Sequence, residues 1–321
     1  MNEERRTSIY IPYRFIMVLF LLFAVIRTFC HAQEDERVKK AQVYIQGGFY
    51  QDAVSLLEKV TVQEPGNTDA IYLLGLGYLG LEKKDDAEVQ FRKCLNLAPE
   101  FEEPYIRLAE ILCDKGEYNQ AKRFLDDLLR KNPKSSNARY ALGVLYYKQQ
   151  KVSEAIGEFT KALLGEPHNH YACANLGYIY YNEKKYDQSL EYFLKASNID
   201  RNNPEYLFAA GWVERKKGEK TKSYQYFNRA SSLSPPTPYS IMYKALQAYD
   251  EGNIDSAQQF LDELFKIDST FSKGLILQAE ILLEKKQPEA AEKIITDLLT
   301  EDPLDTDALE LKARIKSMPP R

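Results

Sequence analysis

The chain has 321 residues, of which 28% are charged and 44% hydrophobic, and its formal net charge is −4. This length is enough for one large or two average domains, and the mildly acidic balance gives no electrostatic reason to expect nucleic acid as a partner. With 23 tyrosines, one tryptophan, 15 glycines and 14 prolines, the composition excludes collagen-like and low-complexity classes and favours a helix-rich globular protein.

The first 32 residues differ from the rest of the chain. Arg5, Arg6 and Arg14 precede an uncharged apolar run over residues 15–26, an order typical of a secretory signal. The run has 12 residues, whereas a helix needs roughly 20 to cross a bilayer. We therefore expect export to the periplasm or the cell envelope.

The end of this segment indicates how it is processed. Cys30, His31 and Ala32 approximate a small-x-small cleavage site, so we expect cleavage after Ala32. The alternative is an uncleaved signal anchor that tethers the chain to the inner membrane through residues 15–26. Acylation of Cys30 is disfavoured because bulky Phe29 and charged Arg27 precede it.

The remaining cysteines, Cys94, Cys113 and Cys173, are far apart, and each lies in a helical pattern. Cysteines in such positions behave as small buried apolar residues. No disulfide is expected.

From residue 34 onward the sequence repeats every 34 residues without a slip in register. Two columns hold only small residues: Ala53, Ala87, Ala121, Ala155, Ser189, Ser223, Ala257 and Ala291; and Ala41, Gly75, Ala109, Gly143, Gly177, Gly211, Ala245 and Ala279. A third column is large and apolar: Leu57, Phe91, Leu125, Phe159, Phe193, Phe227, Leu261 and Ile295. A fourth reads Pro65, Pro99, Pro133, Pro167, Arg201, Pro235, Ser269 and Pro303.

These columns predict two antiparallel helices in each unit. Proline ends the second helix because it cannot continue the hydrogen-bond ladder. The small columns mark where the two helices cross, and the large column fills the space beside the crossing. One pair cannot bury its apolar faces alone, so neighbouring units are expected to stack on a shared core.

The chain resembles the tetratricopeptide repeat family, whose signature joins W-x2-L-G-x2-Y to A-x3-F and a final Pro. The match is close at Leu74, Gly75, Tyr78, Ala87, Phe91 and Pro99, and again at Leu142, Gly143, Tyr146, Ala155, Phe159 and Pro167. The resemblance implies an all-α, right-handed solenoid of eight repeats that binds an extended peptide or a partner helix in the groove lined by its first helices.

The expected repeats span 34–67, 68–101, 102–135, 136–169, 170–203, 204–237, 238–271 and 272–305, followed by a capping helix and tail over 306–321. The proline-rich stretch at 234–239 is expected to be the stiffest joint, and it can separate a six-repeat block from a two-repeat block.

One stretch imitates a nucleotide site. Gly75, Gly77 and Gly80 are spaced as G-x-G-x-x-G, but a dinucleotide fingerprint needs a strand before the loop and a helix that starts at it. Here the three glycines lie inside one expected helix, and only Gly75 belongs to a repeat column. The nucleotide interpretation is rejected, and no cofactor is expected.

A second stripe on the first helices of repeats four to seven points away from each helix's own partner. Its members are Tyr140, Val144, Tyr147, Ala174, Tyr178, Tyr181, Phe208, Trp212, Arg215, Met242, Leu246 and Tyr249, with Tyr171 and Tyr239 near the helix starts. Tyr and Trp are frequent interface anchors, so we expect this stripe to line a partner-binding groove. Packing between adjacent first helices is the alternative for any single residue.

Asn175 lies beside this stripe. The carboxylate clamp of the family uses Lys, Asn and Arg, and Asn175 matches one Asn of it. The flanking clamp positions hold Tyr140, Val144, Glu205 and Ala209, none of them cationic, so the clamp is absent. Asn175 remains a candidate contact to a peptide backbone.

No metal or catalytic site is expected. His168, His170 and Cys173 make an incomplete ligand set, so surface loop residues are the better account of the two histidines. No G-x-S-x-G, P-loop or H-E-x-x-H motif occurs. The sequence therefore favours a non-enzymatic protein-interaction scaffold of the cell envelope. The alternative is a scaffold in polysaccharide or peptidoglycan assembly whose stacked aromatics face sugar rings.

Overall fold

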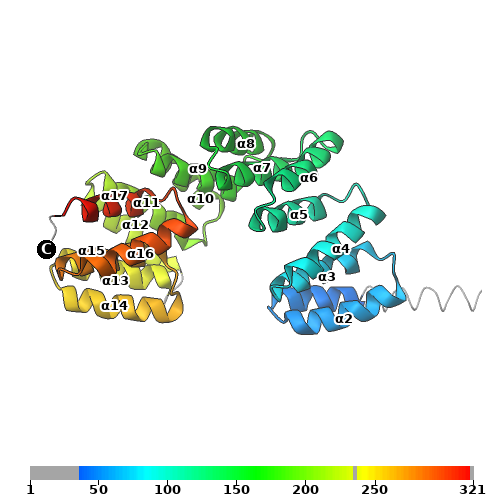
Figure 1. Cartoon of the computed structure of the whole chain (residues 1–321), viewed down its shortest axis with the longest axis horizontal. Coiled ribbons are helices and arrows are strands. Elements are labelled where there is room, and N and C mark those ends of the chain that lie inside the picture. The colour runs from blue at the N-terminus through cyan, green and yellow to red at the C-terminus, as the bar shows by residue number, and fades with distance from the viewer. Residues whose placement is uncertain (1–35, 234–236, 319–321) are drawn as a thin grey trace, which may run out of the picture. The chain divides into compact units, whose positions relative to one another are not determined.

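The computed structural model describes residues 36–233 and 237–318, and within these ranges the secondary structure consists of helices without any strand (Figure 1). The expected signal or anchor over residues 1–32 lies outside the described residues. None of the described helices is both long enough and apolar enough to cross a membrane. The chain forms two compact units, Met1–Lys131 and Asn132–Arg321.

Unit 1 is built from paired helices. Residues 36–46 are helical and are followed by α2 (Tyr50–Gln63), α3 (Thr68–Gly80), α4 (Lys84–Leu97), α5 (Glu102–Asp114) and α6 (Tyr118–Lys131). Unit 2 continues with α7 (Ser136–Lys148), α8 (Val152–Gly165), α9 (His170–Asn182), α10 (Tyr186–Ile199), α11 (Pro204–Lys216), α12 (Lys220–Leu233), α13 (Pro238–Asp250), α14 (Ile254–Ile267), α15 (Ser272–Glu284), α16 (Pro288–Glu301) and α17 (Thr306–Lys316). This is the expected all-α solenoid, with α17 as its capping helix.

The first helices start at capping residues that recur in the 34-residue register. Asn67, Ser135, Asn169, Thr237 and Asp305 each accept a hydrogen bond from the backbone N–H three residues further on. Such a cap satisfies a donor that the helix itself leaves free, which stabilises the helix by about 1 kcal/mol. Phe101 and Phe271 occupy the same register position without a side-chain cap.

The small and large columns meet directly within each helix pair. A Cβ built on Gly75 would lie 2.5 Å from the ring of Phe91, and one on Gly143 would lie 2.6 Å from the ring of Phe159. Both phenylalanines are fully buried. The large residue therefore sits on the small one at the helix crossing.

The G-x-G-x-x-G stretch lies in α3, inside a helix and not at a strand-to-helix turn. A Cβ built on Gly77 would lie 2.8 Å from the side chain of Val54, and one built on Gly80 would overlap the ring of Tyr50. These two glycines let α2 and α3 approach closely. Cys94, Cys113 and Cys173 are buried free thiols, so the described cysteines form no bridge.

The proline-rich stretch does not divide the core. Residues 234–236 lie outside the described residues, but a single core cluster contains Phe227 of α12 before the stretch and Ile241 and Met242 of α13 after it. The boundary between compact units instead falls between Lys131 and Asn132. Shared apolar packing across the joint explains why the prolines do not separate two blocks.

Candidate functional site

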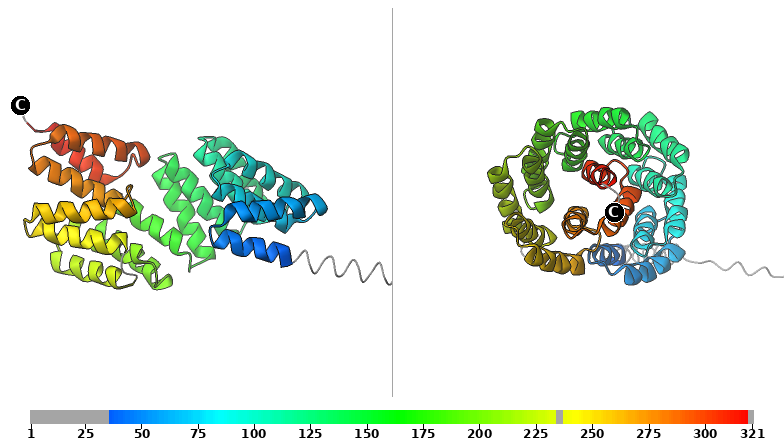
Figure 2. Two further views of the ribbon diagram at one scale, coloured as in Figure 1. Left: turned by 90° about the horizontal axis from the view of Figure 1, so that it is seen from below. Right: turned by 60° about the vertical axis from the view of Figure 1, so that its left-hand side comes forward.

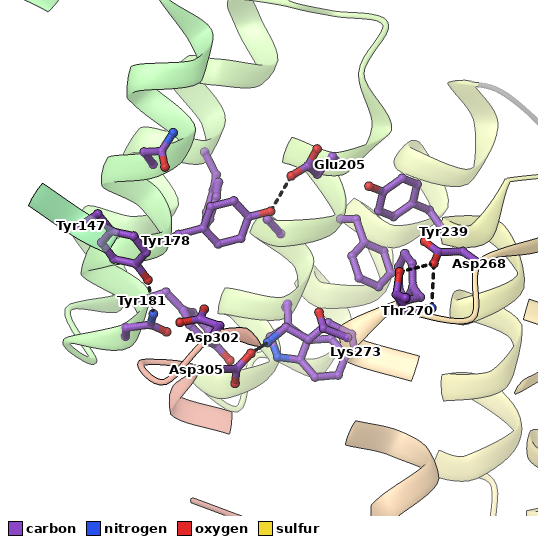
Figure 3. A pocket seen from close by; sticks show the side chains of 18 residues that line it. Tyr147, Tyr178, Tyr181, Glu205, Tyr239, Asp268, Thr270, Lys273, Asp302 and Asp305 are labelled. Atoms are coloured by element: carbon purple, nitrogen blue, oxygen red, sulfur yellow. Dashed lines mark hydrogen bonds and ion pairs between the residues drawn. The ribbon is translucent and has the colours of Figure 1, made fainter. Parts of the chain in front are cut away.

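Unit 2 contains a cavity of about 430 Å³, which we call the Tyr178 cavity (Figure 3). It is lined by the first helices α7, α9, α11, α13 and α15, by one residue of α10, and by the loops before α15 and α17. The lining residues are Tyr147, Asn175, Tyr178, Tyr181, Asn182, Phe193, Glu205, Phe208, Ala209, Trp212, Tyr239, Asp268, Thr270, Phe271, Ser272, Lys273, Asp302 and Asp305.

One wall of the Tyr178 cavity is a cluster of three aromatic rings. The ring of Phe208 lies 5.2 Å from that of Tyr239 and 5.9 Å from that of Phe271, and the last two are 5.4 Å apart. One pair is tilted and the other two are edge-to-face, and at these separations such aromatic pairs attract one another. The wall is thus held in place by its own members.

Tyr178 stands on the opposite side. Its ring packs edge-on against Phe193 at 4.8 Å, and its hydroxyl donates a 2.7 Å hydrogen bond to Glu205 (Figure 3). The side chain is nevertheless 37% exposed. Its ring is therefore fixed in orientation and still accessible from the cavity.

The charged residues that line the Tyr178 cavity are mostly acidic. Asp268 accepts hydrogen bonds from the N–H and hydroxyl of Thr270, at 2.9 and 2.8 Å, and Asp302 accepts one from the N–H of Leu304 at 3.0 Å. These bonds, like that from Tyr178 to Glu205, hold the carboxylates without neutralising them. Across the described ranges no ion pair is formed by Glu205, Asp268 or Asp302.

Burial and these negative charges raise the pKa values of two tyrosines that line the cavity. Burial and then the charge of Asp302 raise the pKa of Tyr147 to about 12. Burial, followed by the charges of Glu205 and Asp268, raises the pKa of Tyr239 as well. Both hydroxyls stay neutral at ordinary pH, so they add no negative charge of their own.

Lys273 is the cation of the Tyr178 cavity, and it is already paired. Its Nζ lies 2.5 Å from the carboxylate of Asp307 and 3.7 Å from that of Asp305. The same Nζ lies 5.3 Å from the ring centroid of Tyr181 and 5.4 Å from that of Trp212, within cation–π range. Its charge is therefore committed to the protein itself.

Asp307 is the centre of a buried cluster that joins four helices. It accepts hydrogen bonds of 2.8 Å from the hydroxyl of Tyr181 on α9 and from the indole N–H of Trp212 on α11. Lys216 of α11 lies 2.6 Å away, and Lys273 of α15 completes the set. We call these five residues the Asp307 cluster.

The charge balance of the Asp307 cluster favours the ionised carboxylate. Asp307 is 4% exposed, and this burial by itself would raise its pKa, but Lys273 and Lys216 outweigh it and lower the pKa. The cluster fixes α17 on the inner side of the helices of unit 2, where Figure 2 shows it in red. A further bond joins the hydroxyl of Thr306 to the backbone oxygen of Asn182 at 2.9 Å.

The residues expected to line a groove are distributed over several environments. Those that line the Tyr178 cavity are Tyr147, Asn175, Tyr178, Tyr181, Phe208, Trp212 and Tyr239. Of these, Tyr181 and Trp212 use their polar atoms to bind Asp307 of the same chain. Their aromatic faces are what remains for a partner, and the partner-binding role of the whole set stays a prediction.

Others lie outside the Tyr178 cavity. Arg215 and Tyr249 line a second hollow of about 430 Å³ beside α17, together with Trp212. Arg215 forms two bonds of 2.6 and 2.7 Å to Asp250, so its charge is used within the chain.

Six residues of the expected stripe remain: Tyr140, Val144, Tyr171, Ala174, Met242 and Leu246. Ala174 and Leu246 are buried, and Leu246 also lines the second hollow. Met242 is fully buried, and packing accounts for its side chain. Tyr140 and Val144 pack against the core of repeats four and five, whereas Tyr171 is exposed beside them, 6.3 Å from the ring of Tyr140.

The histidine pair and Asn175 have local partners. His168 is exposed, but His170 is the first residue of α9, and its Nδ1 lies 2.7 Å from the hydroxyl of Tyr206. No group of three potential metal ligands occurs within the described ranges. Asn175 donates to the backbone oxygen of Tyr171 at 2.9 Å.

The sequence interpretation missed the acidic lining of the Tyr178 cavity and its wall residue Phe271. A signal for Phe271 exists, since it replaces a capping residue in a register position that, apart from Phe101, holds Asn, Ser, Thr or Asp at the other described first helices. Asp268 and Asp302 come from loops after second helices, where the helical pattern makes no prediction about direction.

The chain belongs to the tetratricopeptide repeat family. The family model described as Tetratricopeptide repeat matches residues 78–145, 146–209 and 248–315, more than half of the chain.

Curated relatives match shorter stretches. Human Tetratricopeptide repeat protein 13 is 28% identical over 134 residues, 40% of this chain and 16% of that protein. The UDP-N-acetylglucosamine--peptide N-acetylglucosaminyltransferase of Giardia intestinalis is 31% identical over 83 residues, 26% of this chain and 6% of that enzyme. The chain thus spans only a small part of the length of the relatives it matches.

Solved structures share the fold. Pseudomonas aeruginosa PilF has a TM-score of 0.54 at 24% identity, covering 66% of this chain and 97% of that one. PilW, a type IV pilus biogenesis factor, has a TM-score of 0.55 at 19% identity, covering 64% and 96%. A chain of the Cut9–Hcn1 hetero-tetramer has a TM-score of 0.57 at 16% identity, covering 83% and 52%. The tetratricopeptide fold supports the role of a protein-interaction scaffold.

Proposed function

We propose that this protein is a non-catalytic scaffold or adaptor that holds an extended segment of a protein partner in the Tyr178 cavity of unit 2. The observation that carries the proposal is the accessible, oriented ring of Tyr178 opposite the wall of Phe208, Tyr239 and Phe271. Aromatic side chains that are rigid in the free protein contribute contact area at a low cost in entropy, which is why they anchor interfaces.

The proposal places the protein in the cell envelope. The support is the basic and then apolar order of residues 1–26, which is typical of an export signal or anchor. A scaffold there would hold its partner segment outside the cytoplasm, whether the chain is released by cleavage or tethered by its N-terminus.

The test is photo-crosslinking in cells with the full chain. A photoreactive amino acid replaces Tyr178 in one variant and Leu164 in the control, because Leu164 is exposed on the second helix α8. We expect a discrete protein adduct from position 178 that position 164 does not give. The adduct should weaken when Tyr239→Ala, on the other wall of the Tyr178 cavity, is added.

Three results would contradict the proposal. The first is the absence of any protein adduct from position 178, and the second is the same adducts from both positions. The third is an adduct that resists protease and is degraded by enzymes that cleave polysaccharide, which would point to a glycan-facing scaffold.

A further inference from the structure

We propose that the Tyr178 cavity selects a positively charged side chain, arginine or lysine, on the bound segment. This inference rests on the proposed function and names the chemistry of the partner. It depends on three features of the cavity: its excess of carboxylates, the way those carboxylates are held, and the binding of its own cation by aromatic faces and a carboxylate.

The first feature is the excess of carboxylates. Glu205, Asp268, Asp302 and Asp305 line the Tyr178 cavity against one cation, Lys273. That cation is bound to Asp307, an additional carboxylate beneath the cavity. The charge left facing the cavity is therefore negative, and an anionic segment would be repelled from it.

The second feature is the way the carboxylates are held. Glu205 is oriented by Tyr178, Asp268 by Thr270 and Asp302 by a backbone N–H. Hydrogen bonds of this kind fix a carboxylate but leave further lone pairs free, because each carboxylate can accept about four hydrogen bonds. A guanidinium or ammonium group supplies the missing donors and the missing charge.

The third feature is the behaviour of Lys273. Its ammonium group lies over the rings of Tyr181 and Trp212 while it pairs with Asp307. The same cavity thus already binds one cation with aromatic faces and a carboxylate. Tyr178 and Tyr239 with Glu205 offer the same combination in another part of the cavity, and Lys273 is the one lysine or arginine among the described residues that line it.

The position of Glu205 also favours a cation. In the family's carboxylate clamp this part of the groove carries cationic or amide side chains that bind an anion. Here the position has the opposite sign, so the electrostatic preference should be inverted. A volume of about 430 Å³ also falls within the range of pockets that enclose small ligands, enough for one long side chain and the backbone that carries it.

The probe is a set of capped peptides, Gly-Ser-Xaa-Ser-Gly, in which Xaa is arginine, lysine, citrulline or glutamate. Citrulline has nearly the shape of arginine without its charge. Binding to the full chain is followed by the emission of Trp212, the single tryptophan, which lines the Tyr178 cavity. We expect the arginine peptide to bind about tenfold more tightly than the citrulline peptide and the glutamate peptide not to bind.

The matched variants separate charge from shape. Glu205→Gln combined with Asp302→Asn keeps both hydrogen-bond acceptors but removes two charges, and it should abolish the preference for arginine. Glu263→Gln on the outer helix α14, where Glu263 is exposed, should preserve it. Thermal denaturation of each variant checks that the fold is retained.

Equal binding of the arginine and citrulline peptides, no binding of any peptide, or an unchanged preference in the double variant would overturn the inference. The proposed function is judged independently by the adduct from position 178. A protein adduct together with equal peptide binding rejects only the charge selection. Arginine selection without any protein adduct rejects only the partner-holding role.

Discussion

At the residue scale, the two facing columns compensate each other in volume. Where the small column has Gly, the large column sixteen positions later has Phe: Gly75 with Phe91, Gly143 with Phe159, Gly177 with Phe193, and Gly211 with Phe227. Where it has Ala, the partner is Leu or Ile: Ala41 with Leu57, Ala109 with Leu125, Ala245 with Leu261, and Ala279 with Ile295. The extra methyl group of Ala on the first helix is thus matched by a smaller, aliphatic side chain in place of Phe on the second helix.

This compensation predicts a rescue. Gly143→Ala should destabilise the protein by about 1–2 kcal/mol, because overpacking against Phe159 outweighs the gain in helix propensity. Phe159→Leu should cost about 1–3 kcal/mol by leaving a void. The double variant recreates the Ala–Leu pair of other repeats. Its loss of stability, measured by thermal denaturation, should be smaller than the sum of the losses of the two single variants. Simple additivity would contradict direct contact.

A second residue pair isolates one hydrogen bond. Ser189 and Ser223 occupy equivalent positions and are both fully buried. The hydroxyl of Ser189 donates to the backbone oxygen of Gly177 at 2.8 Å, whereas that of Ser223 has no partner in the described part of the chain.

Alanine substitution should therefore separate the two serines. Ser189→Ala should destabilise the protein by about 1 kcal/mol, and Ser223→Ala should be neutral or stabilising because it removes an unsatisfied hydroxyl. Chemical denaturation of both variants provides the comparison. Equal losses would show that the two hydroxyls have equivalent partners.

At the element scale, the turn inside each helix pair has a fixed left-handed position. The residues with positive φ are Gly48, Glu82, Gly116, Gln150, Lys184, Gly218, Gly252 and Lys286, again 34 residues apart. Glycine adopts this conformation at little cost, whereas other residues lose about 1 kcal/mol. Half of these turns are therefore strained by their side chain.

Replacing such a residue by glycine should relieve that strain. Gln150→Gly, at φ 60°, should stabilise the protein by about 0.5–1 kcal/mol after the entropy gained by the unfolded chain is counted. The adjacent Gln149 has φ −82°, so Gln149→Gly should destabilise it by a similar amount. If both changes shift the melting temperature in the same direction, the left-handed conformation of Gln150 is not strained.

Elements of the fold could be predicted from the sequence because each depends on residues near one another in the chain. Gly143 and Phe159 are sixteen positions apart, and the expected helix pairs follow from such columns. Asp307 could not be placed in advance, since its partner Tyr181 is 126 positions away. That contact depends on how the repeats between α9 and α17 stack on one another, and the 34-residue pattern does not predict this arrangement.

The predicted site shows the same division. Spacing along α9 and α11 placed Tyr178, Phe208 and Trp212 on one face, and these residues line the Tyr178 cavity. The acidic lining arises from loops such as 302–305, whose direction is set by packing and hydrogen bonds after the helices end. The charge preference proposed for the cavity therefore could not be predicted from the sequence alone.

At the scale of unit 2 as a whole, the Asp307 cluster joins its last helix to α9 and α11. The buried carboxylate of Asp307 lies among Lys216, Lys273, Tyr181 and Trp212 and contacts all four side chains. Breaking one member of a buried ion pair leaves the others uncompensated, which costs about 3–5 kcal/mol. The position of α17, and with it one side of the Tyr178 cavity, depends on this cluster.

Asp307→Asn should therefore release α17 and shift the emission of Trp212 to the red, with a stability loss of about 3 kcal/mol. The control is Glu310→Gln on the same helix, whose ion pairs to Lys184 and Lys216 are partly exposed, and it should cost less than about 1 kcal/mol. Similar losses in both variants would contradict the central role of Asp307.

The pH dependence has a definite sign. The folded state lowers the pKa of Asp307, so the stabilisation is fully present above the unfolded-state pKa of about 3.9 and is lost as pH falls below it. Asp250, whose pKa is about 2 because Arg215 and Tyr224 outweigh the effect of burial, adds to the same acid loss. Asp307→Asn should flatten the fall in stability below about pH 4, and an unchanged slope would argue against the assignment.

The central claim, that the Tyr178 cavity receives the partner segment, is tested most directly by hydrogen exchange of the full chain with and without the saturating arginine peptide. We predict protection confined to α9, α11, the start of α13 and the loop before α15, the elements that carry Tyr178, Glu205, Tyr239 and Phe271. Protection of the outer helices α8, α12 or α14 in place of these segments would contradict the account.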